Sequence, residues 1–353
     1  MIDLTKSHAK SEPIVTAGKL AKLFLFFFAF SILILICCSL TGYRNILWEK
    51  SWKLWQWSVW DSQIWHMRIF RLLAAAAVGS ALATAGMALQ GLMRNPLAEP
   101  YIMGISSGAG VGVLLGSSLS LHIGIADWAT TPGLALVGAL ITSVAVYFIA
   151  QRNGRLDPYV LLLSGVIINV FNNALILTVL QFVKQTEMIN FIGWGMGQIP
   201  EWLWFNPKLL IICSALIISG WLIIFLRASS YNTLGLGDEV AASSGVSVHW
   251  IRTETFILIS LMTSAAVALA GPVGFVGLIV PHICRLIFGP DHRYLAIVCG
   301  FGGAIFLMLA DTSCRIIGES FHLGELPVGV VTAITGGPFF IFLLRKRRKE
   351  PQR

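Results

Sequence analysis

Long apolar segments separated by short polar connections run through the chain from about residue 23 to residue 344. Several approach the ~20 residues that a helix needs to cross a bilayer. The pattern predicts ten membrane-spanning segments, at about 23–40, 69–92, 102–120, 133–150, 159–182, 209–226, 254–270, 274–288, 294–310 and 328–344. The eighth is short enough to be partly re-entrant. We therefore expect an all-α polytopic membrane protein, with an N-terminal tail at 1–22, a ten-helix domain at 23–344 and a basic tail at 345–353.

A polar, proline-bounded break separates the second and third predicted segments, at residues 95–100 (NPLAEP). Asn95 precedes Pro96, which moves the Asn95 backbone away from the α region, so the helix must break there. The sequence after the break carries glycines at positions 104, 108, 112 and 116. Four glycines at this spacing form one bare stripe along a helix, which lets a second helix approach closely in lipid.

Composition supports the membrane class and charge gives an orientation. The 353 residues are 56% hydrophobic and 12% charged, far below the charge of about 25% that soluble domains carry. Lysines and arginines gather in both tails and in the connections that share their side, which the positive-inside rule assigns to the cytoplasm. We expect a multi-pass membrane protein with both termini cytoplasmic, and the net charge of +8 reflects this topology rather than nucleic-acid binding.

Several kinds of chemistry are missing from the sequence. It has no HExxH motif and no GxxxxGK[ST] phosphate loop, so we expect neither an enzyme nor a self-contained ATP-driven pump. The six cysteines have no CxxC spacing and are expected to pack as core residues; His282 is expected to be structural, with no metal site. Three possible functions remain: a transporter that depends on a partner for ATP, an ion-coupled secondary transporter, and an intramembrane binding or sensing protein.

The connection between residues 227 and 252 is the largest one on the cytoplasmic side. Asp238 and Glu239 are placed to begin a short helix, where its dipole favours acidic residues, and Gly245 is placed to end it. Such a helix is too short to stand alone in water. It should pack on its own membrane domain or dock into a partner. A transporter without its own nucleotide site requires such a partner.

Three blocks of the sequence resemble the FecCD/BtuC-type permeases of type II ABC importers. The blocks are RIFRLLA at 68–74 with QGLMRNPLAEP at 90–100, GPVGFVGLIVPHICR at 271–285, and ELPVGVVTAITGGP at 325–338. The similarity extends from about residue 20 to residue 346.

The resemblance implies a permease subunit that pairs with a second copy of itself, or with a paralogous permease, around a central path. It also implies two cytoplasmic ATP-binding subunits, which would hold ATP and Mg²⁺ so that this chain needs no cofactor, and a periplasmic or lipid-anchored substrate-binding protein. The cargo would be an iron-siderophore, haem or cobalamin-type chelate, and the sequence does not choose among them. Helices 2–5 and 7–10 would form an inverted pair.

The resemblance also implies roles for individual residues. Asn95 and Leu97 correspond to a cytoplasmic gate. Pro158 and Tyr159 fall in a second gate region, where the cobalamin permease has small hydroxyl residues, so closure there can differ.

Two further sets of residues follow from the same resemblance. The segment 234–248, called here the coupling segment, would contact the ATP-binding subunit through Leu234, Leu236, Asp238 and Glu239. Periplasmic arginines that would pair with acidic residues of the binding protein are Arg68, Arg71 and Arg315. For Arg315 the alternative is a pair with Asp311 on an exposed helix, and lipid headgroups are an alternative for all three.

Overall fold

The computed structural model describes residues 16–41, 59–118, 127–152, 155–205, 207–322 and 324–347. Within these residues seven helices are long and apolar enough to cross a membrane: α1 (Ala17–Leu40), α3 (Val59–Met93), α5 (Asp127–Ala150), α6 (Pro158–Leu180), α8 (Pro207–Leu226), α11 (Val248–Ala270) and α13 (His292–Ser320). Three further apolar helices are shorter or have shorter apolar parts: α4 (Ile105–Ser118), α12 (Val276–Phe288) and α14 (Val328–Arg347). Each of the ten predicted segments therefore corresponds to one helix, and the all-α membrane class is confirmed.

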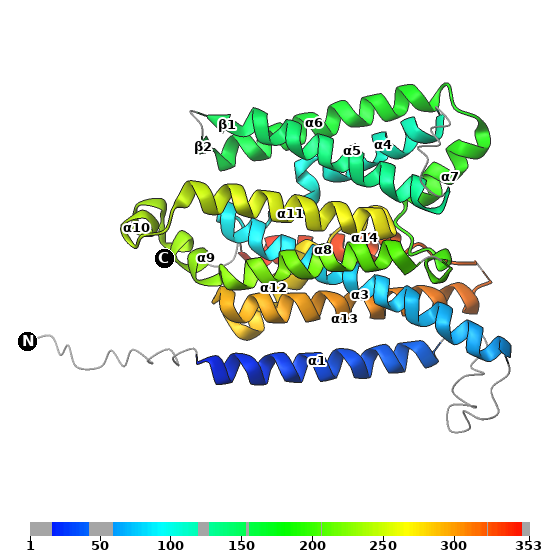
Figure 1. Ribbon diagram of the computed structural model, residues 1–353, viewed down its shortest axis with the longest axis horizontal. Coiled ribbons are helices and arrows are strands. Elements are labelled where there is room, and N and C mark those ends of the chain that lie inside the picture. The colour runs from blue at the N-terminus through cyan, green and yellow to red at the C-terminus, as the bar shows by residue number, and fades with distance from the viewer. Residues whose placement is uncertain are drawn as a thin grey trace, which may run out of the picture.

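The remaining elements lie at the two ends of the bundle (Figure 1). One end carries the antiparallel pair β1 (Gln151–Arg152) and β2 (Arg155–Leu156), together with α9 (Ala228–Leu236) and α10 (Asp238–Ser243). The opposite end carries α7 (Gln185–Gly195) and η3 (Glu201–Trp204), and η2 (Pro100–Met103) precedes α4. Sequence patterning did not predict α7 or η3, because neither has a long apolar run.

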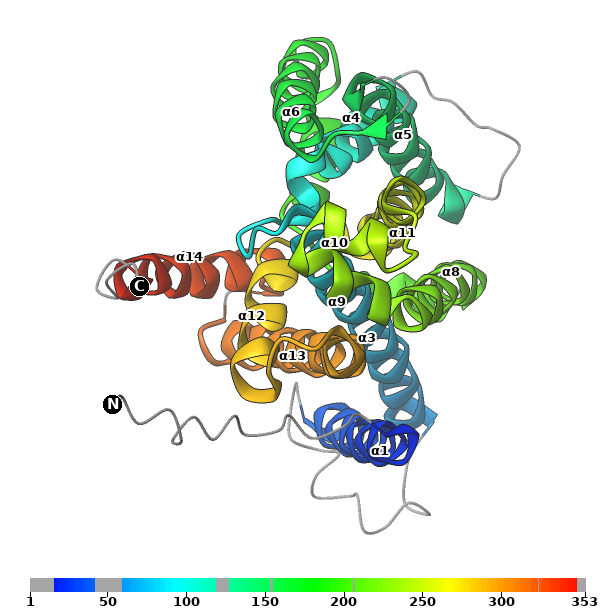
Figure 2. The same cartoon turned by 90° about the vertical axis from the view of Figure 1, so that its left-hand side faces the viewer.

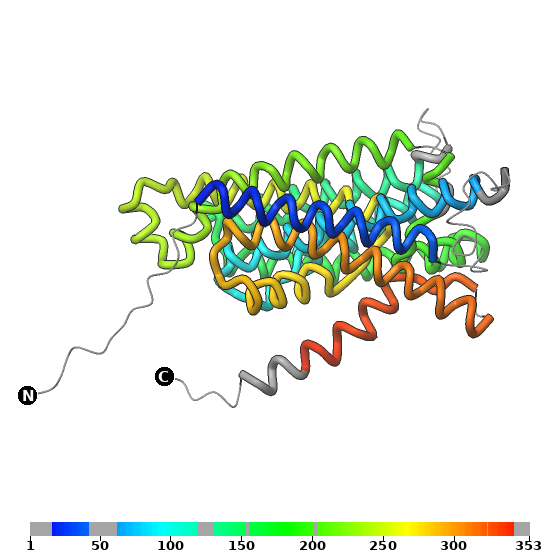
Figure 3. Tube along the Cα trace, turned by 90° about the horizontal axis from the view of Figure 1, so that it is seen from below, coloured from blue at the N-terminus to red at the C-terminus, as the bar shows by residue number. Residues whose placement is uncertain are grey.

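The first described turn of α1 lies at the same end as α9 and α10 (Figure 1), and α14 runs toward that end (Figure 3). Helix α1 begins at Ala17, inside the tail expected at 1–22. Residues 1–15 and 348–353, which make up most of the two predicted tails, lie outside the described residues.

Helix α3 is the centre around which the other helices pack. In its most apolar window 78% of the residues are buried, against 11% for α1 at the periphery. Glycines let two neighbours approach its backbone: a Cβ on Gly79 would overlap the carbonyl of Gly303 in α13, and one on Gly86 would overlap the carbonyl of Gly277 in α12. Close backbone contact of this kind is how helices associate where lipid removes the hydrophobic driving force.

The predicted glycine stripe of α4 lies against α5. Added Cβ atoms would overlap Thr142 at Gly108, the carbonyl of Leu134 at Gly112, and the Leu134 side chain at Gly116. The close packing expected from the spacing is confirmed.

Two of the ten helices are too short to cross the hydrocarbon core. Helix α4 has 14 residues and α12 has 13, which gives each a length of about 20 Å, against a core about 30 Å thick. The short eighth segment was expected; α4 corrects the predicted span 102–120, whose first residues form η2 and a turn. In both cases a non-helical connection must cover the remaining depth.

Replacing Gly112 by Val should separate α4 from α5, because the new side chain has no space against the Leu134 carbonyl. Overpacking of this kind typically costs about 1–3 kcal/mol, so the thermal unfolding midpoint in detergent should fall. The matched control is Gly133→Val on α5, where no atom lies within 4 Å of an added Cβ. Equal midpoints for the two variants would contradict the packing role of the stripe.

Candidate functional site

The break after α3 is built by local hydrogen bonds. Arg94 has a φ of 49°, in the left-handed region, and turns the chain out of the helix. The Asn95 N–H then donates to the carbonyl of Gln90 at 3.2 Å, and the Asn95 side-chain oxygen accepts from the Leu97 N–H at 3.0 Å. The predicted helix break is confirmed, and Asn95 and Leu97 are both half-buried within it.

A second break, at residues 271–275, precedes α12. Gly271 and Phe275 both have positive φ values, 66° and 68°. Phe275 is not a glycine, and a left-handed conformation costs such a residue roughly 1–2 kcal/mol unless its surroundings hold it. This segment lies in one of the blocks that carry the family resemblance, and no site residue was predicted in it.

The two breaks are joined by side chains from the first one. Glu99 accepts a hydrogen bond from the Phe275 N–H at 2.6 Å, and the Tyr101 hydroxyl accepts one from the Val273 N–H at 3.1 Å. The buried Gln90 side chain donates to the Gly277 carbonyl at 3.2 Å and accepts from Arg285 at 3.0 Å. Both breaks therefore form one connected unit next to α12.

Glu99 is the residue of this unit that sequence reasoning should have found. Its carboxylate is part-buried and accepts the hydrogen bond of the Phe275 N–H. The available signal was an ionisable residue between two apolar segments, which is costly at membrane depth and so usually has a defined partner.

The connection from residue 227 to 252 contains two short helices: α10, which is the helix expected in the coupling segment, and α9, which was not predicted. Helix α9 ends at Leu236, and Gly237 leads into α10, which begins with Asp238 and Glu239 as predicted. Gly245, at φ 83°, ends α10 through a bond from the Val246 N–H to the Ala241 carbonyl at 3.0 Å. This is a glycine C-cap, as the sequence indicated.

The four residues assigned to the coupling segment have different surroundings. Leu236 is 72% exposed and Glu239 is also exposed, whereas Leu234 is buried against the chain itself. Asp238 forms ion pairs with Arg94 and with Arg252, at 2.8 Å for the latter. Leu236 and Glu239 are therefore available to a partner, while Leu234 and Asp238 face inward contacts.

The second gate region lies at the start of α6. Asp157 caps this helix by accepting from the backbone N–H groups of Tyr159 and Val160, and Pro158 takes the first helical position. Tyr159 is 76% exposed. The β1–β2 pair directly before it lies at the same end of the bundle as α10 (Figure 2).

The three arginines expected at the outer surface lie inside the protein, which corrects the placement made from the sequence. Arg71 is 3% exposed and pairs with Asp311 at 2.9 Å and with Glu325 at 3.0 Å. Arg68 is 8% exposed and donates to the Ser39 carbonyl at the end of α1. The physical reason is that Asp311 and Glu325, both distant in sequence, lie close enough to pair with arginine, so that its charge can be buried away from water.

Arg315 completes this network. It pairs with Asp311 at 3.2 Å, and it donates to the carbonyls of Thr41 and Cys38. Asp311 is fully buried, so the Asp311–Arg315 pair is not the exposed helix pair considered from the sequence. The network joins α1, α3, α13 and the connection before α14.

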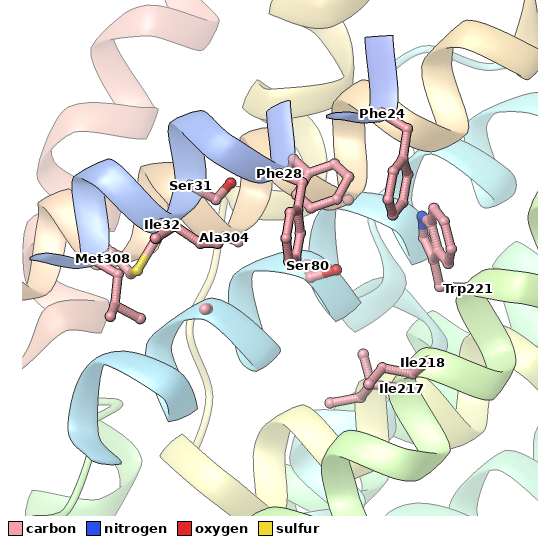
Figure 4. Close-up of a pocket in the computed structure, with 14 residues that line it drawn as sticks. Phe24, Phe28, Ser31, Ile32, Ser80, Ile217, Ile218, Trp221, Ala304 and Met308 are labelled. Carbon is pink, nitrogen blue, oxygen red and sulfur yellow. The ribbon is translucent and has the colours of Figure 1, made fainter. Parts of the chain in front are cut away.

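A cavity of about 370 Å³ lies between α1, α3, α8 and α13 (Figure 4). Phe24, Phe28 and Trp221 dominate its lining, and the Trp221 indole N–H already donates to the Ala296 carbonyl at 2.8 Å. It offers few polar groups to a charged or chelated molecule, so it does not serve as a candidate for the path.

No group of three His, Cys, Asp or Glu side chains among the described residues is arranged to hold a metal ion. His282 lies against the ring of Phe339, with the two ring centroids 6.3 Å apart. Of the six cysteines five are buried and all are free, in agreement with a packing role.

The sequence matches the FecCD transport family over residues 29–346. It is 36% identical over 278 residues to the hemin transport system permease protein HmuU of Yersinia pestis, covering 78% of this chain and 81% of that protein. It is 38% identical over 272 residues to the cobalamin import system permease protein BtuC of Halobacterium salinarum, covering 77% and 70%. A solved ABC transporter in an inward-facing conformation shares the fold, with a TM-score of 0.77 at 23% identity, over 93% of this chain and 99% of that one.

Replacing Glu99 by Ala should destabilise the protein, because the Phe275 N–H loses its partner in a part-buried site. An unsatisfied buried donor costs about 1–3 kcal/mol. Glu99→Gln should cost less, since its amide oxygen can still accept the bond. Thermal unfolding in detergent measures both, and a Glu99→Ala variant as stable as Glu99→Gln would exclude the bond as a support of the breaks.

Replacing Asp311 by Asn should destabilise the protein by about 3–5 kcal/mol, because Arg71 and Arg315 would lose a buried carboxylate. The control is Glu325→Gln, which removes a partner of Arg71 whose side chain is 42% exposed and should cost about 0–1 kcal/mol. Folded yield and unfolding midpoint distinguish the two, and a harmless Asp311→Asn would mean that the arginines do not depend on this network.

Proposed function

The chain belongs to the FecCD transport family and is an ABC importer permease, and on this premise we propose that it forms half of a path for an iron-siderophore, haem or cobalamin-type chelate. The names of two relatives, a hemin permease and a cobalamin permease, support this cargo class. The family match also favours an importer over a secondary transporter or an intramembrane sensor. Since the relatives are transport permeases, we propose that the chain catalyses no reaction itself.

The second half of the path is proposed to be another copy of this chain or a paralogous permease. Helix α14 extends away from the other helices, on the side where the break after α3 and α12 lie (Figures 2 and 3). Large apolar side chains on these helices are exposed, including Leu286 at 70%, Ile287 at 67% and Ile334 at 67%. An apolar surface beside the proposed gate is suited to a two-fold partner, in which Asn95 and Leu97 of each subunit would meet near the axis.

Two ATP-binding subunits are proposed to dock on the coupling segment and to hold ATP and Mg²⁺, so that this chain carries no cofactor. The observation that carries this proposal is the exposure of Leu236 and Glu239 at the end of the molecule where α1 also begins. That end is proposed to be cytoplasmic, in the bacterial inner membrane. It also carries β1, β2 and the second gate region at Pro158 and Tyr159.

The opposite end is proposed to receive cargo from a periplasmic or lipid-anchored binding protein. Arg68, Arg71 and Arg315 would shape this end from inside by holding α1, α3 and α13 together. Their burial makes direct pairing with the binding protein unfavourable, because each would first have to leave a carboxylate or carbonyl partner.

Replacing Leu236 by Ala together with Glu239 by Arg should uncouple transport from ATP hydrolysis in the complex reconstituted with its ATP-binding subunits. The variant removes an exposed apolar contact and reverses a charge without touching buried groups. Transport should fall by at least tenfold relative to hydrolysis, which corresponds to about 1.4 kcal/mol of lost coupling. Leu226→Ala, at a leucine that is 70% exposed at the end of α8, is the matched control. Wild-type transport in the double variant would remove these residues from the ATPase contact.

A further inference from the structure

Arg94 occupies the boundary between α3 and the gate. It is the residue directly before Asn95, and its left-handed backbone, at φ 49°, sets the direction in which the gate residues leave the helix. A residue of this type adopts that conformation at a cost, so it persists where other contacts determine it.

The Arg94 side chain supplies those contacts, and they all reach the coupling segment. Its Nε donates to the Leu234 carbonyl at 2.8 Å, and its Nη2 pairs with the Asp238 carboxylate. Leu234 belongs to α9 and Asp238 begins α10, so one guanidinium bridges both helices across Gly237, whose φ is 130°.

The other contacts of this region run to different helices. Arg252 of α11 donates to both oxygens of Asp238, at 3.0 and 2.8 Å. The Tyr231 hydroxyl is 2.8 Å from the hydroxyl of Thr255 in α11, and Asn232 donates to Asp291 before α13 at 2.7 Å. Within the described part of the chain, the hydrogen bonds of Arg94 join the coupling segment to the chain at the gate.

We propose that Arg94 is a positioning residue, which carries the displacement of the coupling segment to Asn95 and Leu97 and so links the state of the ATP-binding subunits to the gate. This inference rests on the proposed function. The arginine side chain fits the role because its planar fork holds two acceptors in fixed directions, whereas a lysine ammonium holds them as a point charge.

The partial exposure of the pair supports a geometric role rather than a stabilising one. The side chains of Arg94 and Asp238 are 41% and 44% exposed, and ion pairs in such surroundings add little to stability. The competing explanation is that direct packing of α9 on α3, through the buried Leu234, moves the gate without the ion pair.

The experiment uses the full complex with its ATP-binding subunits in lipid nanodiscs, carrying Leu97→Cys as a reporter in every variant. Labelling of position 97 by a maleimide is measured with and without ATP, after subtraction of labelling in the complex without the reporter. Arg94→Gln should keep the ATP-binding subunits bound and should reduce the ATP-dependent change in labelling by about fivefold or more, a typical size for coupling between two sites. Arg94→Lys should retain part of the change.

The matched control is Arg227→Gln, which removes an ion pair with Glu254, 3.0 Å long, at the same end of the molecule and outside the coupling segment. It should leave the ATP-dependent change intact. Asp238→Asn, which also removes the pair with Arg252, should reduce the change at least as much as Arg94→Gln does. The double variant should add little to Asp238→Asn, since both single variants remove the Arg94–Asp238 pair. The Asp238→Asn variant still tests the link if the complex that carries Arg94→Gln fails to assemble.

The outcomes separate the inference from the function on which it rests. A full ATP-dependent change in Arg94→Gln and Asp238→Asn would overturn the link and favour direct packing. An equal loss in Arg227→Gln would also overturn it, because the effect would then be a general one of cytoplasmic charge. A reporter complex with Arg94 intact that binds no ATP-binding subunit would instead contradict the proposed function.

Discussion

Each backbone N–H and C=O group at membrane depth must find its partner inside the protein, because the hydrocarbon region supplies no water. The two breaks at 94–104 and 271–275 are where this constraint acts most strongly, since α4 and α12 are too short to cross the bilayer as helices. Glu99 and Tyr101 meet it by accepting from the backbone of the second break, and Gln90 donates to the Gly277 carbonyl in the first turn of α12. Irregular chain is thus possible inside the bundle, at the segment that we propose as the gate.

The same constraint explains why the first break, which we propose as the gate, is attached to other parts of the protein. The first break is held on one side by Glu99 against Phe275 and on the other by Arg94 against Leu234 and Asp238. Between these two attachments lie Asn95 and Leu97, and the N–H groups of Leu97 and Ala98 fix their turn by donating to Asn95. A short segment fixed at both ends follows the movement of its attachments, one of which lies directly before α12 and the other in the coupling segment.

Charge is arranged differently at the two ends of the molecule. At the end that carries α7 and η3, Arg71 and Arg315 share the fully buried Asp311, and this arrangement connects helices far apart in sequence. At the end that carries α9 and α10, Arg94 and Arg252 share the half-exposed Asp238. Ion pairs to a buried carboxylate are costly to break, so they suit a contact between helices that stays fixed. Ion pairs to a half-exposed carboxylate can be rearranged at low cost, so they suit a contact that moves.

The sequence by itself determined the membrane class, the ten segments, the helix break at Asn95, the glycine stripe and the cap at Gly245, because each depends on residues within a few positions of one another. It also carried the family resemblance. Only the tertiary structure decided which charges are paired: Asp311 meets Arg71 across 240 positions of sequence, and Glu99 meets Phe275 across 176. Local pattern assigns an arginine at a helix end to the surface, since burial of charge without a partner is prohibitive. The partner that makes burial possible comes from another helix, and the packing of α3 against α13 and α12 is what brings it there.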